Sequence, residues 1–347
     1  MSDDSSSNPS RPKRRPRYRG KHPRHFAEKY KEHDPQRYAE TLAHVIASGK
    51  TPAGSHRPVL VAEILEILSP RPGEFAVDCT LGYGGHAREI LSRLQPGGKL
   101  LALDADPIEL PKTEIRLRAH GLGPEIFTTH RANFAGLPQV LASVGVAGAD
   151  IILADLGMSS MQIDDPARGF SVKHEGPLDM RMNPQHGQSA SVVLQKICPD
   201  TLASLLAENA DEPHAAALAP ALAGKTFPTT RSLADAIFAA LPRVKQEEAD
   251  LSIRRVFQAL RIAVNDEFSA LNTFLRNLPA CLNPGGRVAI LTFHSGEDRR
   301  VKKSFEAGLR DGSYSEIAPE VIRPTPAERH SNPRSAPAKL RWARRLA

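Results

Sequence analysis

Three apolar segments that each end in an aspartate constrain the fold of this chain more than any other feature. They are FAVD, LALD and ILAD, which end at Asp78, Asp104 and Asp155. Short apolar runs of this kind predict buried strands, and the segments between them have helical spacing. Strands that alternate with helices form a parallel sheet covered on both faces. Because ligands bind at the carboxyl edge of such sheets, we expect the three aspartates at a binding site.

A long interruption of this alternation predicts an inserted domain. Residues 164–252 contain several helical patterns and no convincing strand. We expect one long helix over 251–278, since its apolar residues recur on one face, and a further strand over 287–295. The proline- and arginine-rich segment 313–347 is expected to have little regular structure. The predicted organisation is a disordered basic arm (1–50), an α/β domain in two parts (51–163 and 253–347) and an all-helical, substrate-binding insertion (164–252).

The charge of the chain is concentrated near its start. The net charge is +7, and residues 1–40 hold eleven basic and six acidic residues, so they carry +5 of it. A proline-rich, charged segment of this kind does not form a packed fold. It suits a polyphosphate such as RNA, because each basic group near a phosphate releases a counterion. A solubilising tail is the alternative reading.

Other features of composition indicate a cytoplasmic protein. No apolar stretch approaches the roughly 20 residues of a membrane helix, and the start of the chain lacks the apolar run of a secretory signal. The three cysteines, Cys79, Cys198 and Cys281, form no CxxC pair and no zinc-finger spacing with histidine. We therefore expect no membrane association and no metal ligands.

The segment GYGGHA predicts a turn that holds a nucleoside-containing cofactor. Gly82, Gly84 and Gly85 follow a predicted strand and open a predicted helix, which lets the backbone approach a ligand closely. Asp104 ends the next strand, where a carboxylate accepts ribose hydroxyls. The turn lacks the third glycine of a dinucleotide fingerprint, and Asp78 would repel a pyrophosphate. We therefore favour S-adenosylmethionine over NAD, with a tight turn that binds nothing as the minority alternative.

The run DLGMSS after the fourth strand predicts the reaction site. Small residues such as Gly157 and Ser159 leave room for a flat ring beside Asp155. Methyl transfer from a sulfonium is an in-line displacement, for which the protein supplies alignment. An exocyclic amine is a poor nucleophile, and an oxygen of Asp155 or Ser159 that accepts one of its hydrogens would expose its lone pair. A helix cap or a ribose contact is the alternative role for Asp155.

Basic and polar residues further along the chain are candidates for substrate binding. Arg181 lies in an apolar run and needs a partner, such as Asp179 or a phosphate. His294, Glu297 and Asp298 could bind a metal or act as acid and base, but Ser295 with Asp298 also forms a capping box, which we favour for those two. His294 can still face the site. A polar stripe on the long helix suits a nucleic-acid backbone or a solvated face, and consists of Arg254, Gln258, Arg261 and Asn265.

In this order, the motifs resemble one family. The segments DCTLGYGGHA, LALDADP, DLGMSSMQIDDPARGF, LDMRMNP and FHSGEDRR are similar to those of the bacterial RsmH/MraW proteins, over about residues 55–345. The resemblance implies a class I, Rossmann-like methyltransferase sheet with a helical insertion. It also implies S-adenosylmethionine-dependent methylation of the N4 amine of a cytosine in 16S rRNA, at the decoding centre of the small ribosomal subunit. The cofactor contacts that it implies are Gly84, Gly85, His86, Asp104, Phe134, Asp155 and Gln162.

The chain also departs from the family pattern at a few positions. Gly296 replaces a leucine, Ala336 replaces an arginine, and Ala210-Asp211-Glu212 stands where the family has Gly-Glu-Glu. These departures concern RNA docking more than chemistry. The sequence leaves open the oligomeric state, a dimer included. It also leaves two other functions open: an NAD-dependent oxidoreductase, and a non-catalytic RNA-binding protein of ribosome assembly.

Overall fold

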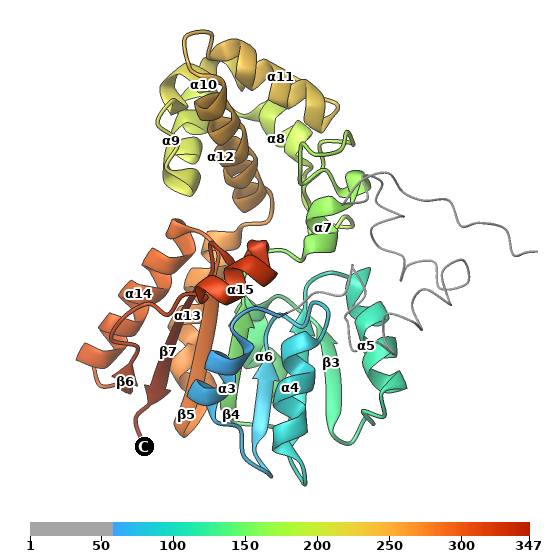
Figure 1. Cartoon of the computed structure of the whole chain (residues 1–347), viewed down its shortest axis with the longest axis vertical. Coiled ribbons are helices and arrows are strands. Elements are labelled where there is room, and N and C mark those ends of the chain that lie inside the picture. Colours follow the sequence, from blue (N-terminus) through green and yellow to red (C-terminus); the bar gives the residue numbers. More distant parts are fainter. Residues whose placement is uncertain (1–57) are drawn as a thin grey trace, which may run out of the picture. The chain divides into compact units, whose positions relative to one another are not determined.

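The computed structural model describes residues 58–347, and the predicted basic arm (1–50) lies outside them. A seven-stranded sheet forms its centre, with the strand order β3-β2-β1-β4-β5-β7-β6 (Figure 1). Strands β1 to β5 pair in parallel, and β7 runs antiparallel between β5 and β6. The strands are β1 (Phe75–Asp78), β2 (Lys99–Asp104), β3 (Phe127–Arg131), β4 (Ala149–Asp155), β5 (Leu282–Thr292), β6 (Tyr314–Ile317) and β7 (Lys339–Arg345). The predicted parallel α/β sheet is thus confirmed.

Helices cover both faces of this sheet, as the alternation of strands and helices predicts. Neighbouring strand residues point to opposite faces, so that Ala76 belongs to one apolar core and Val77 to the other. The helices on the first face are α3 (Val61–Leu68), α4 (Gly85–Leu94) and α5 (Glu109–Ala119). Those on the second face are α6 (Leu137–Ser143), α13 (Glu267–Cys281) and α14 (Ser295–Arg310). In the part of the chain that is described, no helix is long and apolar enough to cross a membrane.

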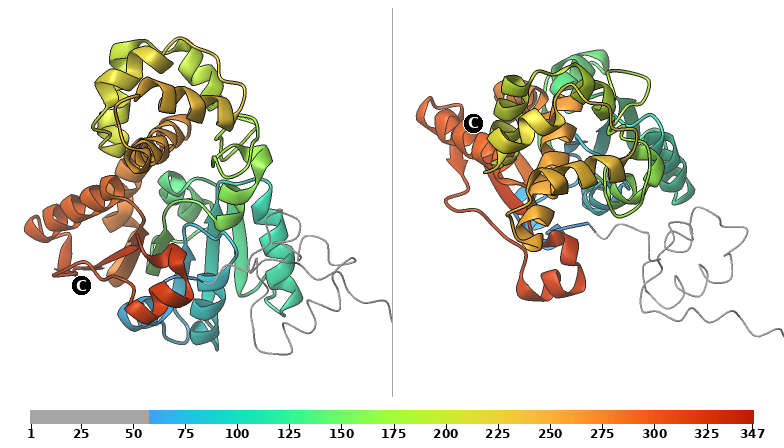
Figure 2. Two further views of the ribbon diagram at one scale, coloured as in Figure 1. Left: turned by 45° about the horizontal axis from the view of Figure 1, so that its top comes forward. Right: turned by 90° about the horizontal axis from the view of Figure 1, so that it is seen from above.

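A third apolar core belongs to the helices between β4 and α13 (Figure 2). Leu202, Leu206, Leu218 and Leu260 are fully buried in it. The helices that supply these residues have apolar faces at helical spacing, which is why they pack on one another. They are α8 (Ala190–Lys196), α9 (Pro199–Ala210), α10 (Ala215–Leu222), α11 (Thr230–Ala240) and α12 (Gln246–Val264), after the short α7 (Ser160–Asp164).

The prediction of one long helix over 251–278 is wrong. Helix α12 ends at Val264 and α13 begins at Glu267, and the backbone of Asp266 between them is left-handed (φ 50°). The side chain of Asn265 accepts a hydrogen bond from the Met182 N–H and donates one to the Met180 carbonyl, which ends the helix. Apolar spacing continues across the break because α12 packs in the third core and α13 in the second-face core.

The prediction of little regular structure over 313–347 is also wrong. This segment forms β6, α15 (Pro326–Ser331) and β7, and β7 pairs with β5 over residues 287–292. Leu340 and Ala343 are fully buried on the two faces of the sheet. The pattern was hidden because Lys339 and Arg341 alternate with the apolar residues and are held by Asp298. The basic residues are thus compatible with an inner strand once a buried carboxylate accepts them.

Helix α5 accommodates a proline in its first turn. The helix runs without interruption from Glu109 to Ala119 and contains Pro111 as its third residue. The first N–H groups of a helix have no partner within the helix, so a proline there costs no hydrogen bond.

Candidate active site

The strand-end aspartates meet at the carboxyl edge of the sheet, as predicted. Asp78 pairs in register with Ala102 of β2 and Leu153 of β4, so the ends of the three strands lie side by side. Asp104 accepts the Gly82 N–H at Oδ2 (2.9 Å) and the Asp106 N–H at Oδ1 (2.9 Å). Each of its oxygens has a remaining lone pair. The edge therefore presents a carboxylate that is held in place and can still accept hydroxyl hydrogens.

The glycine turn brings backbone N–H groups to the same edge. Gly84 has φ 73° and is the N-cap of α4, which begins at Gly85. The positive φ favours glycine at position 84, where a Cβ atom would also lie 2.7 Å from Leu117 Cδ1 of α5. The first N–H groups of α4 are left without helical partners and face the edge of the sheet.

Burial raises the pKa of all three strand-end carboxyl groups. The pKa of Asp155 rises to about 7, first through burial and then through the negative charge of Glu297. That of Asp78 rises to about 6 through burial, although the Thr80 N–H and His86 oppose the shift. Burial also raises the pKa of Asp104. Ionised carboxylates in such a place are stabilised by a cationic ligand, which compensates for their lost hydration.

His86 couples the glycine turn to Asp155. Its Nε2 lies 2.9 Å from the carbonyl oxygen of Val59, and its Nδ1 lies 3.6 Å from Asp155 Oδ2. A carbonyl only accepts, so Nε2 carries the hydrogen and, in the neutral ring, Nδ1 offers a lone pair to the carboxyl group. Burial lowers the pKa of His86. A neutral imidazole therefore faces a carboxyl group that titrates near neutral pH.

Two residues that the sequence analysis missed hold the loop after β4 against the site. Asp106 is 1% exposed and its Oδ2 accepts hydrogen bonds from Gln162 (2.6 Å) and Arg168 (3.0 Å). Arg168 also donates to the Met182 carbonyl (2.8 Å), at the entry to the insertion. Gln162 in turn accepts the Ser159 N–H. The sequence did contain a signal for Asp106, because this aspartate lies two positions after Asp104 within LALDAD. Only the fold shows which residues it binds.

Phe134 follows β3 in a short turn of helix, Phe134–Gly136, at the same end of the sheet. It is half-buried, and its ring lies edge-on to that of Phe274, with centroids 5.3 Å apart. A fixed ring of this kind offers an apolar face to a purine, which is the role that the family resemblance implies.

Most of the residues predicted to bind the substrate have hydrogen-bond or ion-pair partners within the protein. Arg181 pairs with Asp179 (2.7 Å), one of the two partners expected for it. The polar stripe is not a continuous solvated face. Arg261 binds Glu267 through two hydrogen bonds, Gln258 donates to the Asn209 carbonyl, and Asn265 ends α12. Of the four, only Arg254 is exposed. The four residues lie on one face of α12, as their spacing predicts, but other segments of the chain pack against most of this face.

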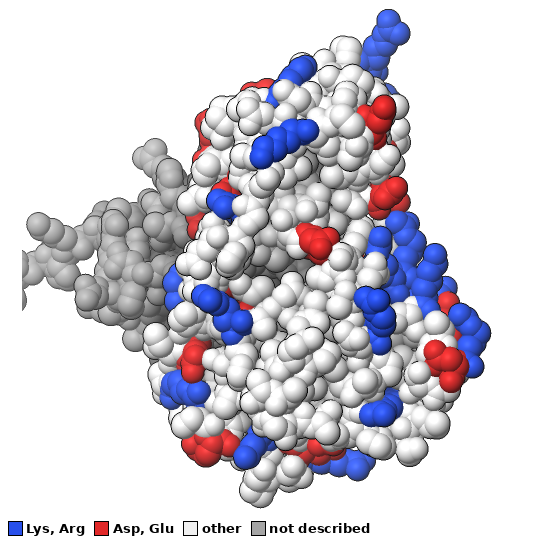
Figure 3. Space-filling model, turned by 180° about the vertical axis from the view of Figure 1, so that it is seen from behind, with Lys and Arg blue, Asp and Glu red and all other residues white. Residues whose placement is uncertain are grey.

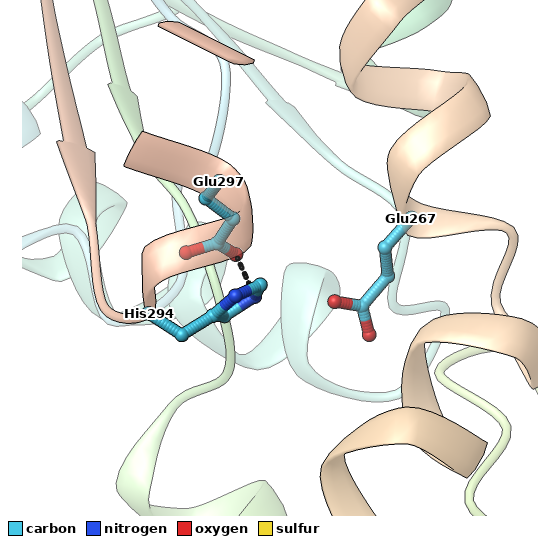
Figure 4. A group of neighbouring side chains, drawn as sticks. All are labelled: Glu267, His294 and Glu297. Atoms are coloured by element: carbon cyan, nitrogen blue, oxygen red, sulfur yellow. Dashed lines mark ion pairs between the residues drawn. The ribbon is translucent and has the colours of Figure 1, made fainter. Parts of the chain in front are cut away.

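The predicted capping box of Ser295 and Asp298 is also wrong. His294 is the N-cap of α14, Ser295 donates to Asp211, and Asp298 binds Lys339 and Arg341. Glu297 instead accepts the Phe293 N–H. It lies beside His294, and Glu267 of α13 completes a group of three side chains whose ligand atoms are all within 4.8 Å of one another (Figure 4).

The sheet order and the site define the class of this protein. A parallel sheet with an antiparallel seventh strand between β5 and β6, and with acidic residues at the ends of β1, β2 and β4, is typical of class I methyltransferases. The carboxyl groups with raised pKa values fit the sulfonium and ammonium charges of S-adenosylmethionine, and Asp104 fits its ribose.

The chain belongs to the MraW methylase family, whose model matches residues 53–346. It is 52% identical to a protein of Alkaliphilus metalliredigens named ribosomal RNA small subunit methyltransferase H 2, over 95% of this chain and 97% of that protein. A protein of Lachnoclostridium phytofermentans named ribosomal RNA small subunit methyltransferase H 1 is 50% identical, over 95% and 92%. The chain is therefore an S-adenosylmethionine-dependent methyltransferase, which removes the oxidoreductase and the non-catalytic protein as alternatives.

Proposed function

We propose that this protein methylates the N4 amine of one cytosine in the decoding centre of 16S rRNA. The rRNA substrate is supported by the names of its relatives, and the observation that carries the chemistry is the half-buried Asp155 at the end of β4, whose pKa is raised to about 7. When bound, S-adenosylmethionine supplies an electrophilic methyl group. The residues that would hold it are Gly84, Gly85, His86, Asp104, Phe134, Asp155 and Gln162.

Asp155 has two roles in this proposal. As a carboxylate it accepts a hydrogen bond from the exocyclic amine, which directs the lone pair of the nitrogen away from the ring. It then takes the proton that the methylated amine must lose, since its pKa of about 7 makes it an effective base near neutral pH. His86 Nδ1 lies 3.6 Å from Asp155 Oδ2, so its lone pair faces the carboxyl group and can accept a hydrogen bond from it once Asp155 is protonated. Ser159 lies in the same loop and provides a second oxygen beside the base.

The surface of the protein supports an RNA substrate. Lys and Arg side chains gather along one side of the face in Figure 3, where α14 lies, while acidic side chains are scattered. Four exposed basic residues of α14 contribute to this surface: Arg299, Lys302, Lys303 and Arg310. Such side chains bind phosphates independently of sequence. The target cytosine must leave its stack to reach Asp155, as for other enzymes that modify a base. Arg181, Arg254, Arg261 and His294 remain proposed contacts to the substrate.

The test is mass spectrometry of small-subunit rRNA from cells that lack this protein. We expect one cytosine to lose its N4 methyl group, and the purified protein with labelled cofactor to restore it. Asp155→Asn should reduce the rate of restoration by at least about a hundredfold, the usual contribution of a general base. Asp235→Asn is the matched control, because Asp235 is exposed on α11.

Two outcomes would contradict the proposal. Unchanged methylation of the rRNA in the deletion strain would exclude the proposed substrate. Full activity of Asp155→Asn would exclude the role assigned to the carboxylate. Circular dichroism of the variant shows whether a loss of activity reflects chemistry or misfolding.

A further inference from the structure

We propose that Glu267, His294 and Glu297 form a binding site for a first-row divalent metal ion. Glu267 lies in the first turn of α13, His294 is the N-cap of α14 two residues after β5, and Glu297 lies in the first turn of α14. One ligand atom from each lies within 4.8 Å of the other two, and Figure 4 shows the His294 ring between the two carboxylates. The sequence analysis named His294 and Glu297 among residues that could bind a metal but favoured no metal site, and Glu267, which is distant in the chain, was not among its candidates.

His294 points to a missing ligand. Its side chain is only 10% exposed, and neither ring nitrogen makes a hydrogen bond of acceptable geometry within the described residues. Its Nε2 approaches Glu297 Oε1 to 3.2 Å, within ion-pair distance. Buried polar atoms in proteins nearly always have partners, and a metal ion between the two carboxylates would supply one to the ring nitrogen.

The two carboxylates are already oriented by other groups. Arg261 donates to both oxygens of Glu267, each at 2.8 Å, and the Phe293 N–H donates to Glu297 Oε2 at 2.9 Å. Each carboxylate oxygen has two lone pairs, so these bonds leave lone pairs for an ion. Carboxylates that bind metals are commonly held in this way by outer hydrogen bonds.

The local charge also favours a cation. Two carboxylates face one guanidinium, so the group carries a net charge of −1 when the imidazole is neutral. Glu297 is 4% exposed, and water therefore compensates little of this charge. The charge of Glu297 reaches Asp155, whose pKa it raises. A divalent ion at the cluster would offset that effect and favour the ionised form of Asp155.

The donor set indicates which ions fit. Two carboxylate oxygens and one imidazole nitrogen suit Mn²⁺ and Zn²⁺ better than Mg²⁺ or Ca²⁺, which prefer oxygen alone. Three protein ligands leave at least one coordination position open, for water or for an oxygen of a substrate. The ion would also join the start of α13, where the chain returns from the helical insertion, to the end of β5.

The experiment is a titration of the full-length, untagged protein with Mn²⁺ after treatment with a chelator. The electron paramagnetic resonance signal of free Mn²⁺ measures binding directly, without substrate or cofactor, so its result does not depend on the proposed function. We expect one site per chain, a rise in the unfolding temperature on binding, and at least tenfold weaker binding in His294→Ala and in Glu267→Gln.

His214→Ala is the matched control. Its ring lies 2.8 Å from Glu248 in the helical insertion, so the variant removes a histidine–glutamate pair elsewhere and should bind Mn²⁺ as the parent does. Either of two results would overturn the proposal: a parent protein that takes up neither Mn²⁺ nor Zn²⁺ at this site, or unchanged binding in the folded Glu267→Gln and His294→Ala proteins. Using both variants keeps the test decisive if one of them fails to fold.

Discussion

The chemistry of the aspartates in the site depends on where their strands end. The carboxyl groups of Asp78 and Asp155 have raised pKa values because β1 and β4 end in the interior of the sheet edge, where hydration is lost. An exposed aspartate would be ionised at every physiological pH. Here Asp78 and Asp155 change their protonation state between about pH 6 and 7. Because a cationic cofactor favours the ionised carboxylates, the free site holds more protons than the cofactor-bound site in this pH range.

Cofactor affinity should therefore increase with pH. The cationic sulfonium of S-adenosylmethionine binds the ionised carboxylates. Below pH 7, the approximate pKa of Asp155, each further unit of decrease in pH should therefore weaken cofactor binding by about tenfold. Affinity should level off above pH 8. Calorimetry of S-adenosylmethionine binding between pH 5.5 and 8.5 measures this.

Asp155→Asn provides the control for this dependence, because an amide does not titrate. The pH dependence of the variant should become weaker, and what remains should follow the lower pKa of Asp78, about 6. A flat profile in the parent protein would show that the carboxyl groups are ionised throughout and that burial does not control them.

Between elements, buried polar contacts fix the loops around the site. Arg168 joins Asp106, which follows β2, to the backbone at Met182, and both charged side chains are almost fully buried. Removal of one member of a buried ion pair leaves the other without compensation. The contact therefore links the cofactor end of the sheet to the entry of the insertion.

Arg168→Ala should lower the free energy of unfolding by about 3–5 kcal/mol, the usual cost of breaking a buried ion pair. Arg88→Ala removes an arginine whose side chain is 60% exposed and should change the same quantity by less than about 1 kcal/mol. Urea titrations of the three proteins give the comparison. Equal effects of the two substitutions would mean that the Asp106 contact contributes no more than a surface pair.

Strand β7 should be as important for stability as the parallel strands. Leu340 is fully buried between β5 and the first-face helices, so Leu340→Ala should cost about 2–5 kcal/mol. Leu346→Ala is the control, since that side chain is 55% exposed. Thermal unfolding distinguishes the two, and a Leu340→Ala protein as stable as its parent would show that β7 is dispensable.

In the molecule as a whole, the apolar residues form three cores, two on the faces of the sheet and one among α8 to α12. The third core shares no buried residue with the other two. Stability need not be uniform in such a chain, because separate cores can open separately.

Leu206→Ala should test this separation. It creates a cavity in the third core, so amide hydrogen exchange should become faster in α8 to α12 and stay unchanged in β1, β2 and β4. Mass spectrometry of exchanged peptides measures both regions in one experiment. Equal acceleration in the sheet would show that the three cores unfold as one unit.

The sequence predicted the elements that follow a simple period. The apolar runs before Asp78, Asp104 and Asp155 are strands of the parallel sheet, and GYGGHA is the turn into α4. The failures share one cause. The break at Asp266, the strand β7 and the partners of Asp298 all depend on residues that are distant in the chain.

The sequence by itself thus determined the parallel sheet, the glycine turn, the three acidic strand ends and, through its motifs, the family. These follow from local periodicity and from residue types that the chain displays openly. Only the tertiary structure decided what each polar group binds: that Arg168 neutralises Asp106, that Arg261 holds Glu267, and that Glu267 meets His294 and Glu297. The physical reason is that burial and pairing of charge arise from contacts between distant segments, which no local pattern records.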